Sequence, residues 1–154
     1  MEKLVCALWR RPDEPREAFN ARLLDTLPAA LAQAGASGIR INLRDCDVEP
    51  AGSLVQQWQD PQQDAVAQFW LASANDRFRA GIDAALASQC LRFAMWLAVE
   101  SAIIPNTAHP AEKGRRTFGW SQASFISFRP DLPREQSRAH WQGHHTRGAI
   151  ETQS

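Results

Sequence analysis

The sequence predicts an α+β protein built on a ferredoxin-like βαββαβ unit, and two observations carry this prediction. Over residues 1–100, apolar or alternating runs and helical stripes follow one another as strand, helix, strand, strand, helix, strand. Two helices can cover only one face of a four-stranded antiparallel sheet, which gives a two-layer sandwich. The second observation is an internal repeat: the seven residues from Arg129 match the seven from Arg11 at six positions. The chain is therefore predicted to hold one full unit and the beginning of a second, similar one.

The first strand and helix follow from a change of periodicity near the N-terminus. Every residue in 4–9 is apolar, which is typical of a strand covered on both faces. Asp13 or Glu14 is placed to cap the following helix. Pro28 is expected to kink or interrupt that helix near its last third. Its inner stripe repeats at intervals of four: Phe19, Leu23, Leu27 and Leu31.

The other elements of the unit are three strands and one helix. Residues 37–44 alternate strictly between apolar and polar, and 64–71 and 90–99 alternate as well, so each is predicted to be a strand. Residues 45–62 show no period and are expected to form a long loop. Asn75 or Asp76 can cap the second helix. Its inner stripe is predicted to be Phe78, Ile82 and Leu86.

Alternation gives each strand one face under the helices and a second face directed away from them. The helix side is expected to hold Ile39, Ile41, Leu43, Phe93, Met95 and Leu97. The second face mixes indole and guanidinium groups, and its candidate ligand-binding residues are Trp9, Arg40, Arg44, Trp70, Arg92 and Trp96. Three tryptophans would not be left in water on a bare sheet, so this face is predicted to meet another sheet. Arginine and indole together suit a planar organic anion, although a stacked interface without a ligand is the alternative.

The second unit is predicted after a linker. Residues 101–120 carry Pro105, Pro110 and Gly114 and are interpreted as that linker. Residues 121–154 would then supply one strand, at about 121–128, and one helix, at about 134–150. Because a strand and a helix cannot bury their own apolar faces, we expect the chain to continue or another chain to complete the unit.

Histidines gather on this last helix. His140 and His144 lie one turn apart, but no carboxylate within a turn completes a metal site, and Arg134 and Arg138 would oppose a cation, so no metal is predicted. His145 takes the place that Leu27 has in the first copy. It is either a buried, hydrogen-bonded anchor or a general acid or base.

The bulk composition excludes several classes of protein. A net charge of +0 and a pI near 6.9 give no field favouring nucleic acid or an anionic membrane. No apolar run approaches the roughly 18 residues of a membrane span, and residues 1–3 lead directly into a strand-like run, so no signal peptide is expected. Three cysteines about 40 residues apart form neither a disulfide framework nor a zinc spacing. We therefore expect a cytoplasmic protein.

The repeat and its helix also resemble a known family. A strand, then Arg-Pro-Asp-x-Pro-Arg-Glu, then a helix with Trp141 four residues before His145, is similar to the EthD-like family of the dimeric α+β barrel superfamily. The most specific piece runs from Arg134 to His145. Arg147 departs from the family, which usually has proline there, and the first copy carries leucines in place of the tryptophan and the histidine.

The resemblance implies a fold, a partner and a range of functions. Members pair two ferredoxin-like sheets face to face, so a dimeric α/β barrel, a homodimer and a lumen are expected. The implied activity is a cofactor-independent conversion of a small aromatic or polyketide-like acid, with His145 and His144 as catalytic candidates. A non-catalytic ligand-binding or accessory module is the alternative, and a haem-handling monooxygenase is a weaker one. No residue stands out as an axial haem ligand, so no cofactor is expected.

Overall fold

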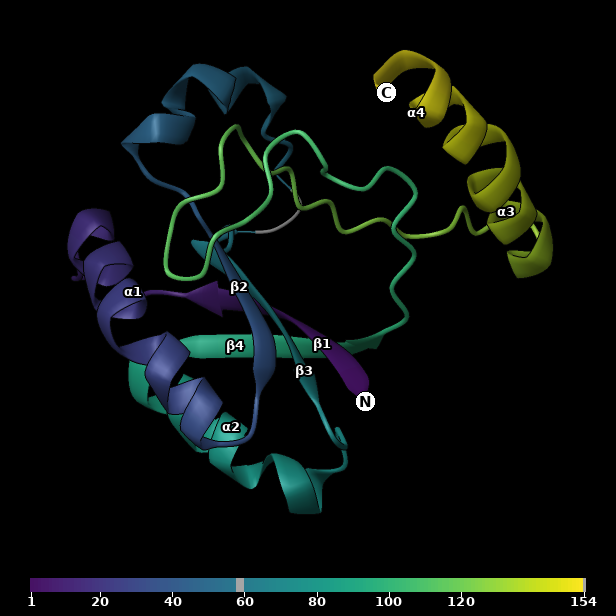
Figure 1. Cartoon of the computed structure of the whole chain (residues 1–154). Helices are drawn as coiled ribbons and strands as arrows, with labels where there is room; N and C mark the ends of the chain where they lie inside the picture. The colour runs from purple at the N-terminus through teal and green to yellow at the C-terminus, as the bar shows by residue number, and fades with distance from the viewer. Residues whose placement is uncertain (58–59, 154) are drawn as a thin grey trace. The chain divides into compact units, whose positions relative to one another are not determined.

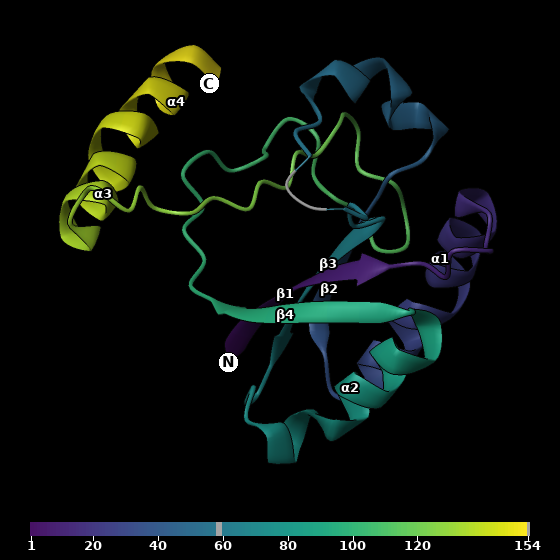
Figure 2. The same cartoon turned by 180° about the vertical axis from the view of Figure 1, so that it is seen from behind.

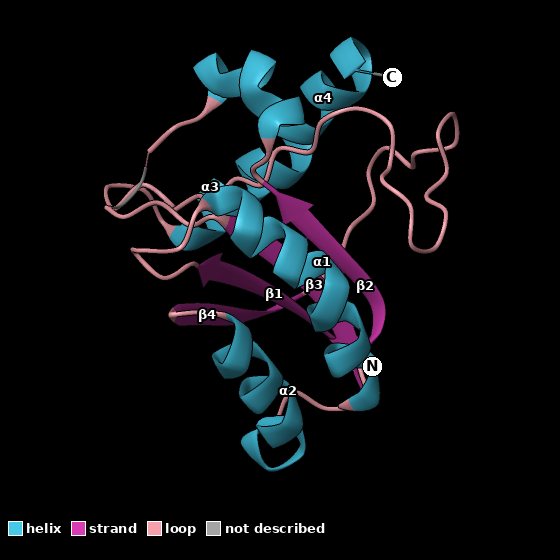
Figure 3. Ribbon diagram, turned by 90° about the vertical axis from the view of Figure 1, so that its left-hand side faces the viewer, coloured by secondary structure: helices cyan, strands magenta, loops and turns pink. Residues whose placement is uncertain are grey.

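The computed structural model describes residues 1–57 and 60–153, which divide into two units, Met1–Glu100 and the residues from Ser101 onward. The first unit is a four-stranded antiparallel sheet in the order β2-β3-β1-β4, with two helices against one face (Figures 1 and 3). This confirms the α+β class and is compatible with the ferredoxin-like fold. The elements are β1 (Glu2–Trp9), α1 (Arg16–Gln33), β2 (Ser37–Leu43), η1 (Cys46–Leu54), β3 (Ala65–Leu71), α2 (Asp76–Gln89) and β4 (Arg92–Ala98).

The core lies between the sheet and the two helices. All four residues of the predicted α1 stripe are fully buried, together with Leu4, Cys6 and Leu8 of β1. Apolar residues of β3 complete the cluster, and five of the six residues predicted on the helix side pack against it: Ile39, Ile41, Leu43, Phe93 and Met95. The predicted register of the strands is therefore confirmed for β2 and for most of β4.

Two predicted core residues are exposed instead. Leu97 is 63% exposed and Phe78 is 67% exposed. Leu97 is the penultimate residue of an edge strand, where the helix layer covers less of the sheet (Figure 2). Phe78 lies in the first turn of α2, at the N-terminal end of its predicted stripe. Ile82 and Leu86 stay on the contact line and are buried, whereas the first member turns towards solvent.

The start and middle of α1 also differ from expectation. The N-cap residue is Pro15, and no side chain caps the helix, so the prediction of Asp13 or Glu14 as the cap is wrong. Glu14 instead receives hydrogen bonds from both Nε and Nη2 of Arg22, at 3.0 and 2.6 Å. Pro28 does not interrupt the helix, which continues to Gln33. Extensive burial of the α1 stripe outweighs the single backbone hydrogen bond that a proline removes.

The second unit contains a helical segment but no strand in its described part. The helix runs through α3 (Arg134–His140), a π-helical turn η2 (Trp141–His145) and α4 (Thr146–Gln153), which agrees with the predicted helix. Residues 121–128 form a loop, so the predicted strand is wrong here. A strand needs a neighbour to satisfy its N–H and C=O groups, and no described residue pairs with this segment as a sheet partner.

Candidate functional site

Trp9 and Arg92 are in contact with each other on the second face of the sheet. The two residues are register partners across β1 and β4, and the Arg92 Cζ atom lies 4.1 Å from the centroid of the Trp9 ring. The indole is only 3% exposed, and its Nε1–H donates a hydrogen bond of 2.9 Å to the carbonyl oxygen of Pro61. The indole is therefore held in place, and its ring orients the guanidinium of Arg92 through a cation–π contact.

The hydrogen-bonding edge of Arg92 is not used within the described part of the chain, where its one recorded contact is the indole. Three other arginines near this end of the sheet have carboxylate partners. Arg10 and Arg16 both reach Asp64, at 3.2 and 3.7 Å, and Arg22 pairs with a glutamate. Arg92 therefore has the chemistry needed to receive an external carboxylate.

Lys3 and Trp70 make a second cation–indole pair, and the sequence analysis missed Lys3. Its Nζ atom lies 5.7 Å from the Trp70 ring centroid, and the two residues are register partners across β1 and β3. The sequence contained a signal for Lys3, because it lies an even number of residues from Trp9 in the first strand and therefore points to the same face. The ammonium also forms an ion pair with Glu100, so its charge is already compensated. Gly38, with φ of +57°, lets the indole lie against β2, since an added Cβ would stand 3.0 Å from the Trp70 ring.

The remaining predicted ligand-binding residues lie apart from these pairs. Trp96, opposite Val5, is 41% exposed. Arg40 is exposed and lies opposite Gln68, on the edge strand β2, which is at the opposite edge of the sheet from β4. Arg44 follows β2, and its carbonyl oxygen accepts a hydrogen bond from the side-chain amide of a buried asparagine of α1. Five of the six predicted residues, all but Arg44, thus share one face by register, and Trp9 and Arg92 are in contact with each other.

The histidines of the second unit form stacked pairs on the helix surface. The ring of His145 stacks on Trp141 at a centroid distance of 4.1 Å, and the rings of His140 and His144 stack at 5.0 Å. His145 is exposed, so the interpretation as a buried anchor does not hold for this unit. Among the described residues no group of three or more His, Cys, Asp and Glu side chains could hold a metal ion. The catalytic roles of His144 and His145 stay predictions.

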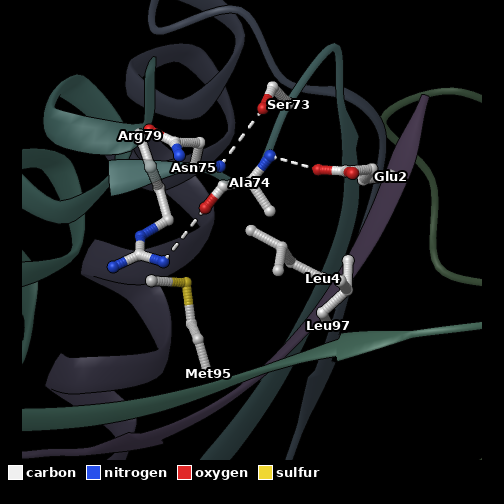
Figure 4. A pocket seen from close by; sticks show the side chains of 8 residues that line it. All are labelled: Glu2, Leu4, Ser73, Ala74, Asn75, Arg79, Met95 and Leu97. Carbon is white, nitrogen blue, oxygen red and sulfur yellow. Dashed lines mark hydrogen bonds between the residues drawn. The ribbon is translucent and has the colours of Figure 1, made fainter. Parts of the chain in front are cut away.

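A cavity of about 460 Å³ lies on the helix side of the sheet and contains none of the predicted site residues (Figure 4). Leu4, Met95 and Leu97 line its apolar part. Its polar groups are already engaged: Glu2 accepts a hydrogen bond from the backbone N–H of Ala74, and an arginine of α2 donates to the Ala74 carbonyl oxygen. We therefore attribute this cavity to the incomplete cover of β4 and place the candidate site on the second face.

No protein-family model matches the chain, and a search of curated proteins finds no match either. None of the helices in residues 1–57 and 60–153 is long and apolar enough to cross a membrane. The chemistry of the second face is thus the main guide to function. It offers the guanidinium of Arg92, oriented on the Trp9 ring and without a carboxylate partner among the described residues, which suits an organic anion.

Proposed function

We propose that this protein binds a small organic acid in a dimeric α+β barrel of the EthD-like kind. In this proposal the second face of the sheet meets the same face of a second copy, and the ligand occupies the space between the two sheets. The observation that carries the proposal is the Trp9–Arg92 stack, in which a fixed indole orients a guanidinium whose donors remain available. Binding rather than catalysis is favoured, because the Trp9–Arg92 contact orients a cation.

The character of the second face supports its burial in a dimer. Trp96 is 41% exposed and lies on an edge strand. Lys3 and Arg92 each lie against an indole, an arrangement that gains strength when water is removed. A specific interface of this kind should bury more than about 1,000 Å² and should be centred on tryptophan.

Light scattering tests the assembly at micromolar concentration. We expect a dimer of the 17.2 kDa chain, and we expect Trp96→Glu to convert it into a folded monomer, because the change places a carboxylate in the interface. Leu24→Glu is the matched control, since Leu24 is 57% exposed on α1, away from this face. A wild-type monomer with accessible tryptophans, or equal effects of the two changes, would contradict the barrel. Calorimetric titration with a panel of aromatic and aliphatic acids tests the binding.

A catalytic function is the second candidate, and the π-helical turn Trp141–His145 favours it. Such turns occur often at functional sites, and this one presents the imidazole of His145 on the ring of Trp141. The test is turnover of aromatic and polyketide-like acids, followed by mass spectrometry, in the wild type and in His145→Leu. Product formed only by the wild type, with equal melting of both proteins, would support catalysis. Absence of product would leave the binding function in place.

A further inference from the structure

The two edge strands of the sheet differ in how well they are protected against further pairing. In β2 the register shifts between Ser37 and Arg40, Gly38 has a φ of +57°, and Arg40 adds a charge. Irregularities and charges of this kind block the addition of another strand. The β4 edge is different, because residues 93–99 are all apolar and its register with β1 is continuous over the whole strand. An edge with these properties is suited to pair with a further strand.

Apolar side chains also lie uncovered along β4. Leu97 is 63% exposed, and Val99, directly after the strand, is 100% exposed. The cavity on the helix side ends at the same strand, since Met95 and Leu97 form the wall that β4 contributes (Figure 4). Within residues 1–57 and 60–153 the sheet ends at β4, and no further strand continues this wall. The cover that is missing therefore belongs on the outer side of β4.

The hydrogen bonds of β1 identify the backbone groups that β4 directs outward. The carbonyl oxygen of Leu8 accepts a hydrogen bond of 2.9 Å from Asp64, just before β3, and that of Trp9 accepts one of 2.9 Å from Leu91, just before β4. Odd-numbered residues of β1 therefore bond towards β4, where their register partners are even-numbered. Because the direction of bonding alternates along a strand, the odd-numbered residues of β4 bond outward. These residues are Phe93, Met95 and Leu97.

We infer that β4 pairs in antiparallel orientation with β4 of a second copy, about a two-fold axis that passes Met95. In this register Met95 lies opposite its own counterpart, and Phe93 of each copy lies opposite Leu97 of the other. Because these are the residues with outward backbone groups, each pair exchanges two N–H···O=C bonds, for about six in all. A two-fold interface must be complementary to itself, and outward residues placed symmetrically about Met95 meet this requirement.

The side chains of β4 also fit this register. On the second face Ala94 lies opposite Trp96, so a small side chain meets a large one. The one charged residue of the strand, Arg92, lies opposite an alanine and meets no like charge. On the helix side, Phe93 of one copy lies beside Leu97 of the other, where it covers the exposed leucine and extends the open wall of the cavity.

This interface goes beyond the proposed function, because the barrel uses the second face of the sheet and leaves its edge open. Edge pairing joins the four strands of each copy into one continuous sheet. Two strands of 7 residues make a contact at or below the roughly 1,200 Å² that stable complexes bury. We therefore expect an association that is weak at micromolar concentration and populated at about 0.1 mM.

Disulfide cross-linking of the full chain tests this pairing. The background is Cys46→Ala, which removes the exposed native thiol and keeps the two buried ones. The Cα atoms of a hydrogen-bonded antiparallel pair lie about 5.5 Å apart, within the range of about 4.4–6.8 Å that a disulfide spans. Met95→Cys should therefore give a covalent dimer on a non-reducing gel after oxidation with diamide at the higher concentration.

Leu97→Cys is the matched control, because it lies on the same side of the same strand. Leu97 is exposed, whereas Met95 is partly buried, so random collisions would favour cross-linking of Leu97→Cys. In the inferred register the two copies of position 97 stand about 13 Å apart along the strands, too far for a disulfide. We expect Met95→Cys to give about tenfold more covalent dimer than Leu97→Cys. Equal yields, or no covalent dimer from Met95→Cys, would overturn the inference.

A proline separates backbone pairing from side-chain contact. Placed in the Met95→Cys protein, Leu97→Pro removes an outward N–H and leaves the bonds to β1, whereas Leu97→Ala keeps that N–H. The proline should lower the yield of covalent dimer about tenfold, and the alanine should lower it less. Equal losses would contradict strand pairing. Circular dichroism checks that each variant folds, and the comparison of Met95→Cys with Leu97→Cys decides the matter if the proline variant does not.

The outcomes for the edge and for the barrel are separate. Met95 packs against the core on the helix side, so face-to-face pairing through the second face does not bring two copies of it together. A dimer that does not cross-link through Met95→Cys overturns edge pairing and leaves the barrel standing. Cross-linking of a protein that light scattering finds monomeric at micromolar concentration supports edge pairing and contradicts the barrel.

Discussion

Truncation of two leucines on the same side of the sheet should have very different costs. Leu27 is fully buried in α1, so Leu27→Ala removes its transfer free energy and leaves a cavity, for an expected loss of about 2–5 kcal/mol. Leu97 is 63% exposed, which leaves roughly a third of its surface buried. Full burial of a leucine is worth about 1.5–3 kcal/mol, so Leu97→Ala should cost roughly 0.5–1 kcal/mol.

Urea unfolding followed by circular dichroism measures both free energies of unfolding. The slope of the transition should stay constant, so that the change in midpoint reports stability alone. In thermal unfolding, each kcal/mol corresponds to about 4–8 °C for a unit of this size. If Leu97→Ala costs as much as Leu27→Ala, then the helix side of β4 is covered in solution, and the exposed end of that strand must lie in an interface.

Three further predictions concern a helix cap and the cysteines. Asn75→Ala should lower stability by about 0.5–2 kcal/mol in urea unfolding, because its side-chain oxygen accepts a hydrogen bond from the backbone N–H two residues on, whereas Asn75→Asp should not. In the native protein a thiol reagent should modify only the exposed Cys46 rapidly, and the buried Cys6 and Cys90 should react after denaturation; rapid native reaction of all three would contradict their burial. Burial raises the pKa of the Cys90 thiol from 9.0 to about 11. The folded protein therefore keeps this thiol neutral at a pH where the unfolded chain loses the proton, so the free energy of unfolding is unaffected by Cys90 below about pH 9 and falls as the pH rises towards 11. Urea midpoints at pH 8 and pH 10 should therefore differ less in Cys90→Ala than in Cys46→Ala.

The sequence predicted those features that depend on local periodicity. Four-residue spacing identified the buried stripe of α1, and alternation assigned the two faces of β2 and β3 correctly. Whether a side chain is covered also depends on where its strand lies in the sheet, and local periodicity does not contain that information. This explains the wrong prediction of burial for Leu97. Leu97 has the parity of a core residue, yet it lies near the end of an edge strand. A periodic pattern states which way a side chain points and does not state whether another element covers it.

The candidate site shows the same division. Composition and parity placed Trp9 and Arg92 on one face, but their contact depends on the register between β1 and β4, which the sequence did not supply. Lys3 was missed because it stands directly before an apolar run, where a single charged residue is common at the start of a strand. The separation of Arg40 from this pair follows from the strand order, which places β2 and β4 at opposite edges.

The two copies of the repeat show which part of the motif acts locally. Pro15 has φ −58° and ψ 143°, Pro133 has φ −54° and ψ 137°, and a helix begins at the next residue in each copy. The motif thus fixes the start of a helix without help from the rest of the fold. The preceding apolar residues become a strand only in the first copy, where β1 has a neighbour on each side.

The single mismatch within the motif lies at a residue that makes a tertiary contact in the first copy. Glu14 holds Arg22, which also donates a hydrogen bond of 2.8 Å to the carbonyl oxygen of Gln89 at the end of α2. The second copy has Leu132 at the position of Glu14 and His140 at the position of Arg22, so this pair of residues is not repeated there. The residue that differs therefore holds the arginine that links α1 to the end of α2 in the first unit. The second copy starts its helix in the same way without this connection, so the start of the helix does not depend on it.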